Sequence, residues 1–373
     1  MVAAWCLGCG GPAPAPPPPL PPPVGAEAYA AHLRERAEVD LSPSELAAAA
    51  ERDALRIEAR LDELADRIAP GSSWRAVFGR LREDHPASRR EVLDAYRRES
   101  RRARRFVVER NLMTLPEAPL EVVDTAELPR PERYPLTAYL GYRVVAATRS
   151  AGGAPRLLDH CAVCVPPLAI HETFPGHHAA FLRQRAAAGR SREETPEVRA
   201  LAAEHFKNRF FHEGWAQYAE LVMLEAGYYD GEPERELGAW RNLLLRATRA
   251  RLDPLLHTAA LSTAEAEGIL ARELLLSPEL AREEVRRHLE EPGLKAAYYV
   301  GAVQVLALRR RVTGRGPSPA EGSGLQAFHD RFVERPMPVP EVARRRFGVE
   351  LPGWPEEGLS RFLRGGSKVD SRR

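Results

Sequence analysis

The chain has 373 residues, which suffices for one large domain or two small ones with a core around a catalytic cleft. Its 54 basic and 52 acidic residues nearly cancel, so no long-range field of one sign would attract nucleic acid or another acidic polymer. We therefore expect a protein that could be an enzyme and that has no nucleic-acid partner.

The first 26 residues carry no charge and form a segment of their own. A short apolar stretch leads to Cys9, and a proline-rich tract at residues 10–23 follows as an extended spacer. This order resembles the cleavage site of a bacterial lipoprotein, in which the cysteine carries the lipid. No Lys or Arg precedes the apolar stretch, which suggests a truncated signal whose start codon lies upstream. Two predictions stay open: an extracytoplasmic lipoprotein tethered to the membrane through Cys9, or a disordered tail on a cytoplasmic protein.

Helical patterns dominate most of the chain. In "SPSEL", Ser42 can cap a helix, Pro43 fits its first position and Glu45 completes a capping box. The periodicity of Ala, Leu and Ile then predicts one long helix that ends at Ile68. A second helix is predicted to begin after Ser88, which has a glutamate three residues later.

Residues 115–155 break the helical pattern, because prolines and glycines multiply there and β-branched pairs appear in "EVVD" and "RVVAA". We expect loops with short strands in this region. Helical patterns resume after Pro167 and continue to about Leu363. The sequence therefore predicts a single mainly α domain with a small β insertion over residues 27–364, followed by a disordered tail at 365–373.

The octet "HETFPGHH" at 171–178 carries the residue types of a hydrolytic zinc site. Such a site needs three ligands from histidine and carboxylate, and a nearby carboxylate that accepts a proton from water. In the common His-Glu-x-x-His pattern the second histidine follows the first by four residues, but here Pro175 has that place and would clash in a regular helix. The helix must widen or break, and a bulge of two residues would bring His177 to the ligand position. We predict His171 and His177 as ligands, with His178 as the alternative.

A second stretch, "HEGWAQYAE" at 212–220, can supply the third ligand. Glu213 and Glu220 are seven residues apart and share one helix face. Glu213 follows His171 by 42 residues, a separation that lets an antiparallel helix return to the first one. Glu213 could therefore complete the ligand set, while Glu220 orients a ligand from outside the metal shell.

Together the two stretches resemble the twin signature of a large bacterial family, domain of unknown function family 885 (DUF885), which is grouped with gluzincin-type zinc metallopeptidases. Three later stretches are similar to motifs of that family in the same order, namely "RARLDPLLH", "PGLKAAYYVG" and "FHDRFV". The resemblance covers residues 27–362. It implies a mostly helical, zincin-like fold of the gluzincin and neurolysin kind, a zinc cofactor, and hydrolysis of an amide bond.

The resemblance also implies roles for the residues of the two signatures. His171, His177 and Glu213 would hold the zinc ion. Glu172 would be the general base that accepts a proton from water and later returns it to the leaving amine.

Four residues of the later motifs are further candidates. Arg249, Asp253 and His257 recur every four residues and share a helix face, from which His257 could face the cleft while Arg249 and Asp253 pair as support. Tyr298 could donate a hydrogen bond to the developing oxyanion. Helix packing or a surface ion pair is an equally good interpretation of each.

Two departures from the family pattern bear on the substrate. Family members usually have a substantial helical region before these motifs, and a Leu-Gln pair is common where this chain has Ala179 and Ala180. We therefore expect substrate binding to differ, or the cleft to be more open.

Cys161 and Cys164 form a single C-x-x-C pair ahead of the octet. They could build a structural zinc site with the histidines, form a disulfide in an extracytoplasmic protein, or remain two buried thiols. The gap to the first histidine is short for a zinc finger, which favours the disulfide or the thiols.

The sequence thus predicts a zinc-dependent hydrolase, preferably a peptidase acting on a peptide or small amide substrate. An amidase or esterase acting on a non-peptide metabolite is the alternative within catalysis. A lipid-anchored binding protein with a decayed hydrolytic site is the alternative outside catalysis, although all three ligands and the base are present.

Overall fold

The computed structural model describes residues 20–128, 137–139, 143–149, 155–189, 207–314, 324–355, 358–359 and 362–363. The predictions of a lipidated Cys9 and of a disordered tail at 365–373 lie outside these residues.

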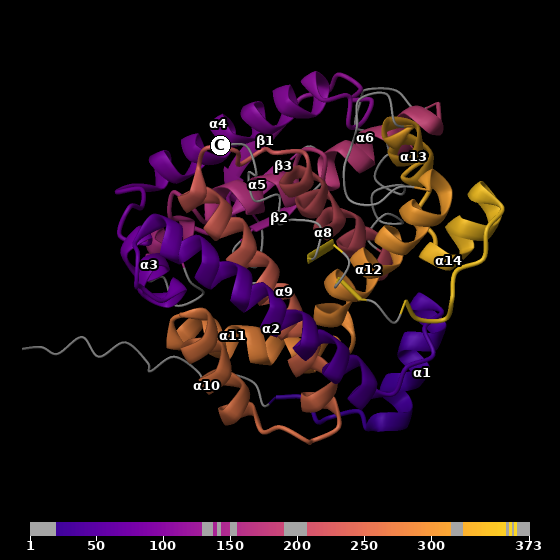
Figure 1. Cartoon of the computed structure of the whole chain (residues 1–373), viewed down its shortest axis with the longest axis horizontal. Helices are drawn as coiled ribbons and strands as arrows, with labels where there is room; N and C mark the ends of the chain where they lie inside the picture. The colour runs from indigo at the N-terminus through magenta and orange to yellow at the C-terminus, as the bar shows by residue number, and fades with distance from the viewer. Residues whose placement is uncertain are drawn as a thin grey trace, which may run out of the picture.

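Most of the described residues are helical (Figure 1). The α-helices are α1 (Ala26–Ala37), α2 (Pro43–Ile68), α3 (Trp74–Leu81), α4 (Arg89–Glu109), α5 (Val165–Glu172), α6 (His177–Ala187), α8 (Arg209–Glu225), α9 (Pro233–His257), α10 (Thr263–Leu274), α11 (Pro278–Glu290), α12 (Leu294–Thr313), α13 (Leu325–Phe332) and α14 (Val339–Val342). Shorter turns of 3-10 or π helix are η1 (Thr125–Glu127), η3 (Leu157–His160) and η4 (Ala343–Phe347).

The two predicted helix starts are confirmed. Ser42 caps α2 and forms both hydrogen bonds of the capping box with Glu45, and the helix ends at Ile68 as its periodicity predicted. Ser88 caps α4 by accepting a hydrogen bond from the backbone amide of Glu91. Local capping chemistry therefore fixes where both long helices begin.

Three short strands form the small β insertion: β1 (Glu121–Asp124), β2 (Thr137–Tyr139) and β3 (Arg143–Ala146). The strand order is β1-β3-β2, in which β3 pairs parallel with β1 and antiparallel with β2. A second, smaller core joins this sheet to the helices α4, α5 and α6, and consists of Val92, Leu93, Tyr96, Val122, Val144, Ala146, Val165, Ala169 and Phe181. The predicted mainly α fold with a small β insertion is confirmed.

The main core lies among the long helices, where α2 packs along α9 and α12 packs along α8. The second pair approaches closely at two glycines. A Cβ atom on Gly214 would lie 2.5 Å from the Cα atom of Gly301, and a Cβ atom on Gly301 would lie 2.0 Å from the carbonyl oxygen of Phe210. Larger residues would push α8 away from α12 and would displace Glu213, the neighbour of Gly214.

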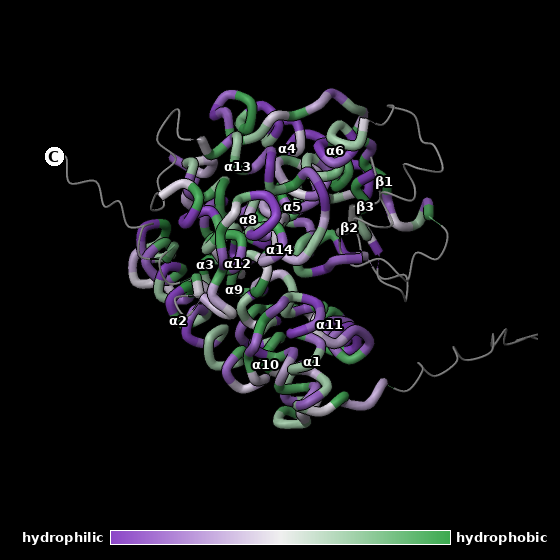
Figure 2. Tube along the Cα trace, turned by 90° about the vertical axis from the view of Figure 1, so that its right-hand side faces the viewer, coloured by the Kyte–Doolittle hydropathy of each residue, from purple (hydrophilic) through white to green (hydrophobic). Residues whose placement is uncertain are grey.

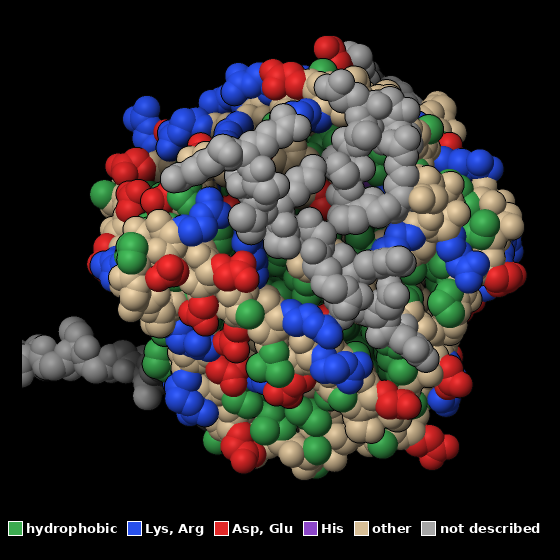
Figure 3. All heavy atoms as spheres, viewed as in Figure 1, with side chains coloured by type: hydrophobic (Ala, Val, Ile, Leu, Met, Phe, Trp, Pro, Cys, Tyr) green, Lys and Arg blue, Asp and Glu red, His purple; other side chains and the backbone are tan. Residues whose placement is uncertain are grey.

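The helices α1, α10 and α11 gather at one end of the molecule, and α4, α6 and the sheet lie at the other (Figures 1 and 2). Hydrophilic and hydrophobic residues alternate along α10 and α11, as expected of helices with one buried face (Figure 2). Acidic and basic side chains intermingle on the face seen in Figure 3. None of the helices in the described parts of the chain is long and apolar enough to cross a membrane.

Candidate metal centre

The octet folds as a helix, a sharp turn and a second helix. α5 ends at Glu172 and α6 begins at His177, and the turn between them contains a cis bond between Phe174 and Pro175. The predicted interruption at Pro175 is therefore a complete break, rather than a bulge of two residues within one helix.

Two features allow the turn to fold tightly against its neighbours. Gly176 approaches the end of α5 so closely that an added Cβ atom would lie 2.0 Å from the carbonyl oxygen of His171. The indole Nε1 of Trp215, on α8, donates to the carbonyl oxygen of Pro175 at 3.0 Å. The glycine and the tryptophan of the two signatures thus attach the turn to the helix that carries Glu213.

His171, His177 and Glu213 form a buried group that could hold a metal ion, since one ligand atom from each lies within 4.8 Å of the others. Oε2 of Glu213 lies 3.3 Å from Nε2 of His171 and 3.4 Å from Nε2 of His177. Tetrahedral bonds of zinc length place neighbouring ligand atoms about 3.4 Å apart. The donor set and these two spacings fit a zinc ion.

Glu220 orients His171 from behind the group. Its Oε1 atom accepts a hydrogen bond from Nδ1 of His171 at 2.8 Å, and its Oε2 atom accepts one from Nδ2 of Asn242, on α9, at 2.7 Å. With Nδ1 engaged in this way, Nε2 of His171 points toward Glu213. This carboxylate-histidine pairing is the arrangement that commonly supports a metal ligand.

The charges of the group are those of a cation site. Burial alone would lower the pKa of His171, but its hydrogen bonds to Glu213 and Glu220 outweigh burial and raise this pKa to about 9. Burial would raise the pKa of Glu213, yet hydrogen bonds from His171 and His177 hold it well below its ordinary value. Both shifts favour a positive charge among these residues, and a metal ion could take the place of the histidine proton.

Glu172 and His178 directly follow His171 and His177 in the chain. The ring of His178 is fully buried and packs edge-on against Phe174 with ring centres 5.2 Å apart. Burial lowers the pKa of His178 to about 3, so the ring is neutral. His178 is not part of the three-residue group, whereas Glu172 lies at the end of α5 and lines the cavity described next.

A cavity of about 380 Å³ opens onto the group and extends between α5, α8, α9, α11 and α12. Its wall includes His171, Glu172, His177 and Glu213, and Tyr298 from α12. The Tyr298 ring stacks on the His171 ring with centres 5.6 Å apart. Burial raises the pKa of Tyr298 above its ordinary value, so the hydroxyl keeps its proton. The structure thus brings these five predicted residues to one cavity, and Arg249 is a sixth.

The remaining candidates lie on one face of α9, part of which lines the cavity while the rest is buried in the protein interior. Arg249 lines the cavity, where its guanidinium forms two hydrogen bonds to Glu284 at 2.8 and 2.6 Å. Asp253 is fully buried and accepts hydrogen bonds from Tyr29 and His288 instead of pairing with Arg249.

His257 lies in the protein interior, as Asp253 does. Its Nε2 atom lies 2.8 Å from the carbonyl oxygen of His288, and its ring stacks on Tyr29. It is fully buried and is not among the residues that line the cavity.

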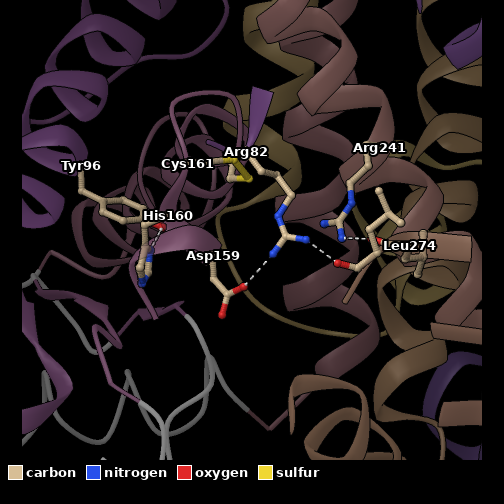
Figure 4. The surroundings of a disulfide bond; sticks show 9 residues. Arg82, Tyr96, Asp159, His160, Cys161, Arg241 and Leu274 are labelled. Carbon is tan, nitrogen blue, oxygen red and sulfur yellow. Dashed lines mark hydrogen bonds and ion pairs between the residues drawn. A yellow bond between two sulfur atoms is a disulfide. The ribbon is translucent and has the colours of Figure 1, made fainter. Parts of the chain in front are cut away.

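Cys161 and Cys164 form a disulfide directly before α5 (Figure 4). Of the three interpretations of the C-x-x-C pair, the structure thus has the disulfide. Cys164 lines the cavity, and Arg82 and Arg241 lie nearby.

The sequence motifs do not reveal the arginine-containing face of α9 that lines the cavity. The helix contributes Gly238, Arg241, Asn242, Leu245, Arg246 and Arg249 to the cavity wall. These positions recur with the helical period, so they form one stripe. The signal that could have revealed the stripe is this recurrence of arginines inside an otherwise hydrophobic helix.

Fold and site together define a mainly helical protein with a buried His/His/Glu group at the wall of a cavity. The chain belongs to the DUF885 family, whose description is "Bacterial protein of unknown function" and whose model matches residues 11–345. No curated protein is similar enough to count as a match.

Two solved structures share the fold. A "putative lipoprotein" from Colwellia psychrerythraea superposes with a TM-score of 0.72 at 20% identity, over 87% of this chain and 56% of that one. A "putative lipoprotein of unknown function" from Shewanella oneidensis superposes with a TM-score of 0.69 at 22% identity, over 88% of this chain and 60% of that one. The chain thus spans little more than half the length of either solved relative.

Proposed function

We propose that the protein is a zinc-dependent hydrolase of amide bonds with a zincin-like, gluzincin-type active site. The observation that carries the proposal is the convergence of His171, His177 and Glu213 on one point at the wall of a cavity. Two histidines, one carboxylate and an adjacent glutamate are the donor set of hydrolytic zinc sites.

A bound zinc ion would polarise the amide carbonyl and lower the pKa of water. Glu172 would accept the proton of the attacking water and deliver it to the leaving nitrogen. Its position directly after His171 and at the cavity wall supports this role. Glu220 and Asn242 would hold His171 in the orientation that the cation requires.

Tyr298 would stabilise the oxyanion. Its hydroxyl remains protonated because burial raises its pKa, and its ring lies against His171. A protonated hydroxyl on a ring that lies against one of the proposed ligands can donate a hydrogen bond to an oxygen on which charge develops. Arg249 supports the wall through Glu284, and His257 takes no part in this mechanism.

We further propose that the protein acts outside the cytoplasm. The disulfide between Cys161 and Cys164 favours an oxidising compartment. A lipid on Cys9 would agree with the descriptions of the two solved relatives as lipoproteins.

The test is hydrolysis of a mixture of short peptides by the zinc-loaded protein, followed by mass spectrometry. We expect cleavage that a chelator abolishes and zinc restores, and a loss of about 100- to 10,000-fold in rate for Glu172→Gln with the zinc retained. Glu290→Gln, a surface change on α11, is the matched control and should keep full activity. Zinc binding without cleavage of any peptide or small amide would contradict the proposal and favour a binding protein.

A further inference from the structure

The cavity beside the metal group is rich in arginine. Seven cationic and five carboxylate side chains line it, and two of the carboxylates, Glu172 and Glu213, belong to the proposed zinc site. Apart from those two, three carboxylates face seven cations, so positive charge is in excess where a substrate would bind.

Most of these cations have a carboxylate partner. Glu284 binds both Arg249 and Lys295, Asp159 lies 3.7 Å from Arg82, and Arg287 pairs with a glutamate outside the cavity. These ion pairs stabilise the cavity wall, and their cations are already neutralised, so they attract an anionic ligand only weakly.

Arg246 is different. Its side chain is only 5% exposed, yet it forms no ion pair or hydrogen bond with any residue in the described part of the chain, and its Nε atom is buried without a partner. The guanidinium lies over the ring of Tyr298, 4.3 Å from the ring centre, and Tyr298 in turn stacks on His171. An unpaired cation is thus buried one side chain away from the metal ligands.

Arg241 continues the stripe away from the metal group. It precedes Arg246 by five residues, a rise of about 7.5 Å along α9. Its NH2 atom donates to the carbonyl oxygen of Leu274 at 2.5 Å, and no described carboxylate pairs with it (Figure 4). Burial and the neighbouring Arg82 lower the pKa of Arg241 to about 9, so it remains charged at neutral pH.

Burying a guanidinium without a counter-charge costs stability. A protein can tolerate this loss of stability at a binding site, where an anionic ligand supplies the counter-charge. A guanidinium offers two parallel donors that match a carboxylate. Because a cavity of about 380 Å³ is at the small end for ligand sites, it suits the end of a short peptide better than an internal segment of a long one.

We infer that Arg246 binds the C-terminal carboxylate of a short peptide whose scissile amide lies at the metal group. Arg241, five residues earlier on α9, is the second contact for this carboxylate. The inference rests on the proposed hydrolytic function and narrows it to an enzyme that acts at the carboxyl end of its substrate. Arg246 is the principal contact for the carboxylate, because only the Tyr298 ring separates it from His171.

The test measures binding without cleavage, by calorimetry with zinc-loaded Glu172→Gln protein. Three acetylated dipeptides serve as probes: one with a free C-terminus, the same dipeptide as its C-terminal amide, and an amidated dipeptide that carries a glutamate side chain. We expect the free acid to bind about 10- to 100-fold more tightly than its amide. Equal binding of acid and amide would overturn the inference, and so would preferred binding of the amidated glutamate peptide.

Variants then locate the carboxylate. Arg246→Gln in the same background should remove the preference for the acid, whereas Arg286→Gln, which loses an equal charge outside the cavity, should keep it. Persistence of the full preference in Arg246→Gln would overturn the assignment.

Thermal unfolding distinguishes a ligand-binding arginine from a structural one. Because Arg246 has no ion pair or hydrogen bond to lose in the described part of the chain, only its contact with the Tyr298 ring, Arg246→Gln should change the Tm little. The free-acid probe should raise the Tm of the Glu172→Gln protein but not that of the double variant. A large fall in Tm for Arg246→Gln would indicate a structural role and contradict the inference.

The two proposals can fail separately. Equal cleavage rates for acid and amide substrates by the wild type would leave the hydrolase intact and remove the carboxylate site. An acid preference in binding, without any cleavage by the wild type, would retain the carboxylate site and remove the hydrolase.

Discussion

Two buried clusters of this protein are built from the same residue types and have opposite properties. One is the metal group of His171, His177 and Glu213. The other, here called the sealed cluster, consists of His257, His288 and Asp253. Both contain two histidines and one carboxylate, and all of these residues are at least nine-tenths buried.

The clusters differ in where their polar atoms point. In the sealed cluster, Asp253 accepts hydrogen bonds from Tyr29, His288 and the amide of Gly293, and His257 bonds to a backbone carbonyl oxygen. The protein engages the Asp253 carboxylate and one ring nitrogen of each histidine, while Nδ1 of His257 and Nε2 of His288 are buried without a hydrogen-bond partner in the described part of the chain. None of the three residues lines the cavity.

In the metal group, by contrast, the ligand atoms converge and the cavity reaches them. The residue types of a cluster therefore do not identify a metal site by themselves. The ligand atoms must also converge on one point, and a substrate must be able to reach them.

Substitutions in the two clusters should have different effects on metal content. We expect about one zinc per chain in the wild type and almost none in His177→Ala or Glu213→Ala, because two ligands do not retain zinc against dialysis. His178→Gln and Asp253→Asn should retain the metal. Elemental analysis measures this, and loss of zinc in His178→Gln would reassign the ligand.

Asp253→Ala should have the largest effect on folding. The change leaves the buried donors of Tyr29, His288 and Gly293 without an acceptor, so we expect a loss of about 3–5 kcal/mol in the free energy of unfolding. Urea denaturation measures it, with the exposed Asp40→Ala as a control that should change stability by less than about 0.5 kcal/mol. Stability close to that of the wild type would show that the sealed cluster is not structural.

Glu220→Gln should weaken the metal group without destroying it. The glutamine can no longer hold Nδ1 of His171 as a charged acceptor, so we expect zinc affinity to fall about 10- to 100-fold. Competition with a chromogenic chelator gives the affinity. An unchanged value would mean that Glu220 does not support the ligand.

His288 should give the smallest effect, which depends on pH. Burial lowers its pKa from 6.5, although the hydrogen bond to Asp253 opposes this. Below pH 6.5 the unfolded chain therefore binds a proton that the folded chain does not, and stability falls as the pH falls, by at most about 1.4 kcal/mol per unit. Urea unfolding between pH 7 and 5 should show a shallower decline for His288→Gln. Equal declines would contradict the assignment.

The sequence predicted those parts of the fold and site that depend on local chemistry. The capping box at Ser42 and the clash at Pro175 act within a few residues, so the start of α2 and the break in the octet could be read directly. The family motifs added the expectation that His171, His177 and Glu213 act together.

The remaining features depend on contacts between distant elements, which a single sequence does not reveal. Asp253 was expected to pair with Arg249, four residues away, but its partner Tyr29 lies in α1. Arg246 belongs to no sequence motif. Its place at the cavity depends on the packing of α9 against α12, which brings it over the ring of Tyr298.

The metal group is tested most directly by an X-ray structure of the zinc-loaded protein, with anomalous data collected on both sides of the zinc absorption edge. We expect one strong peak about 2.0–2.2 Å from Nε2 of His171, Nε2 of His177 and a carboxylate oxygen of Glu213. A peak at the sealed cluster, or no peak between these three residues, would contradict the proposed metal site.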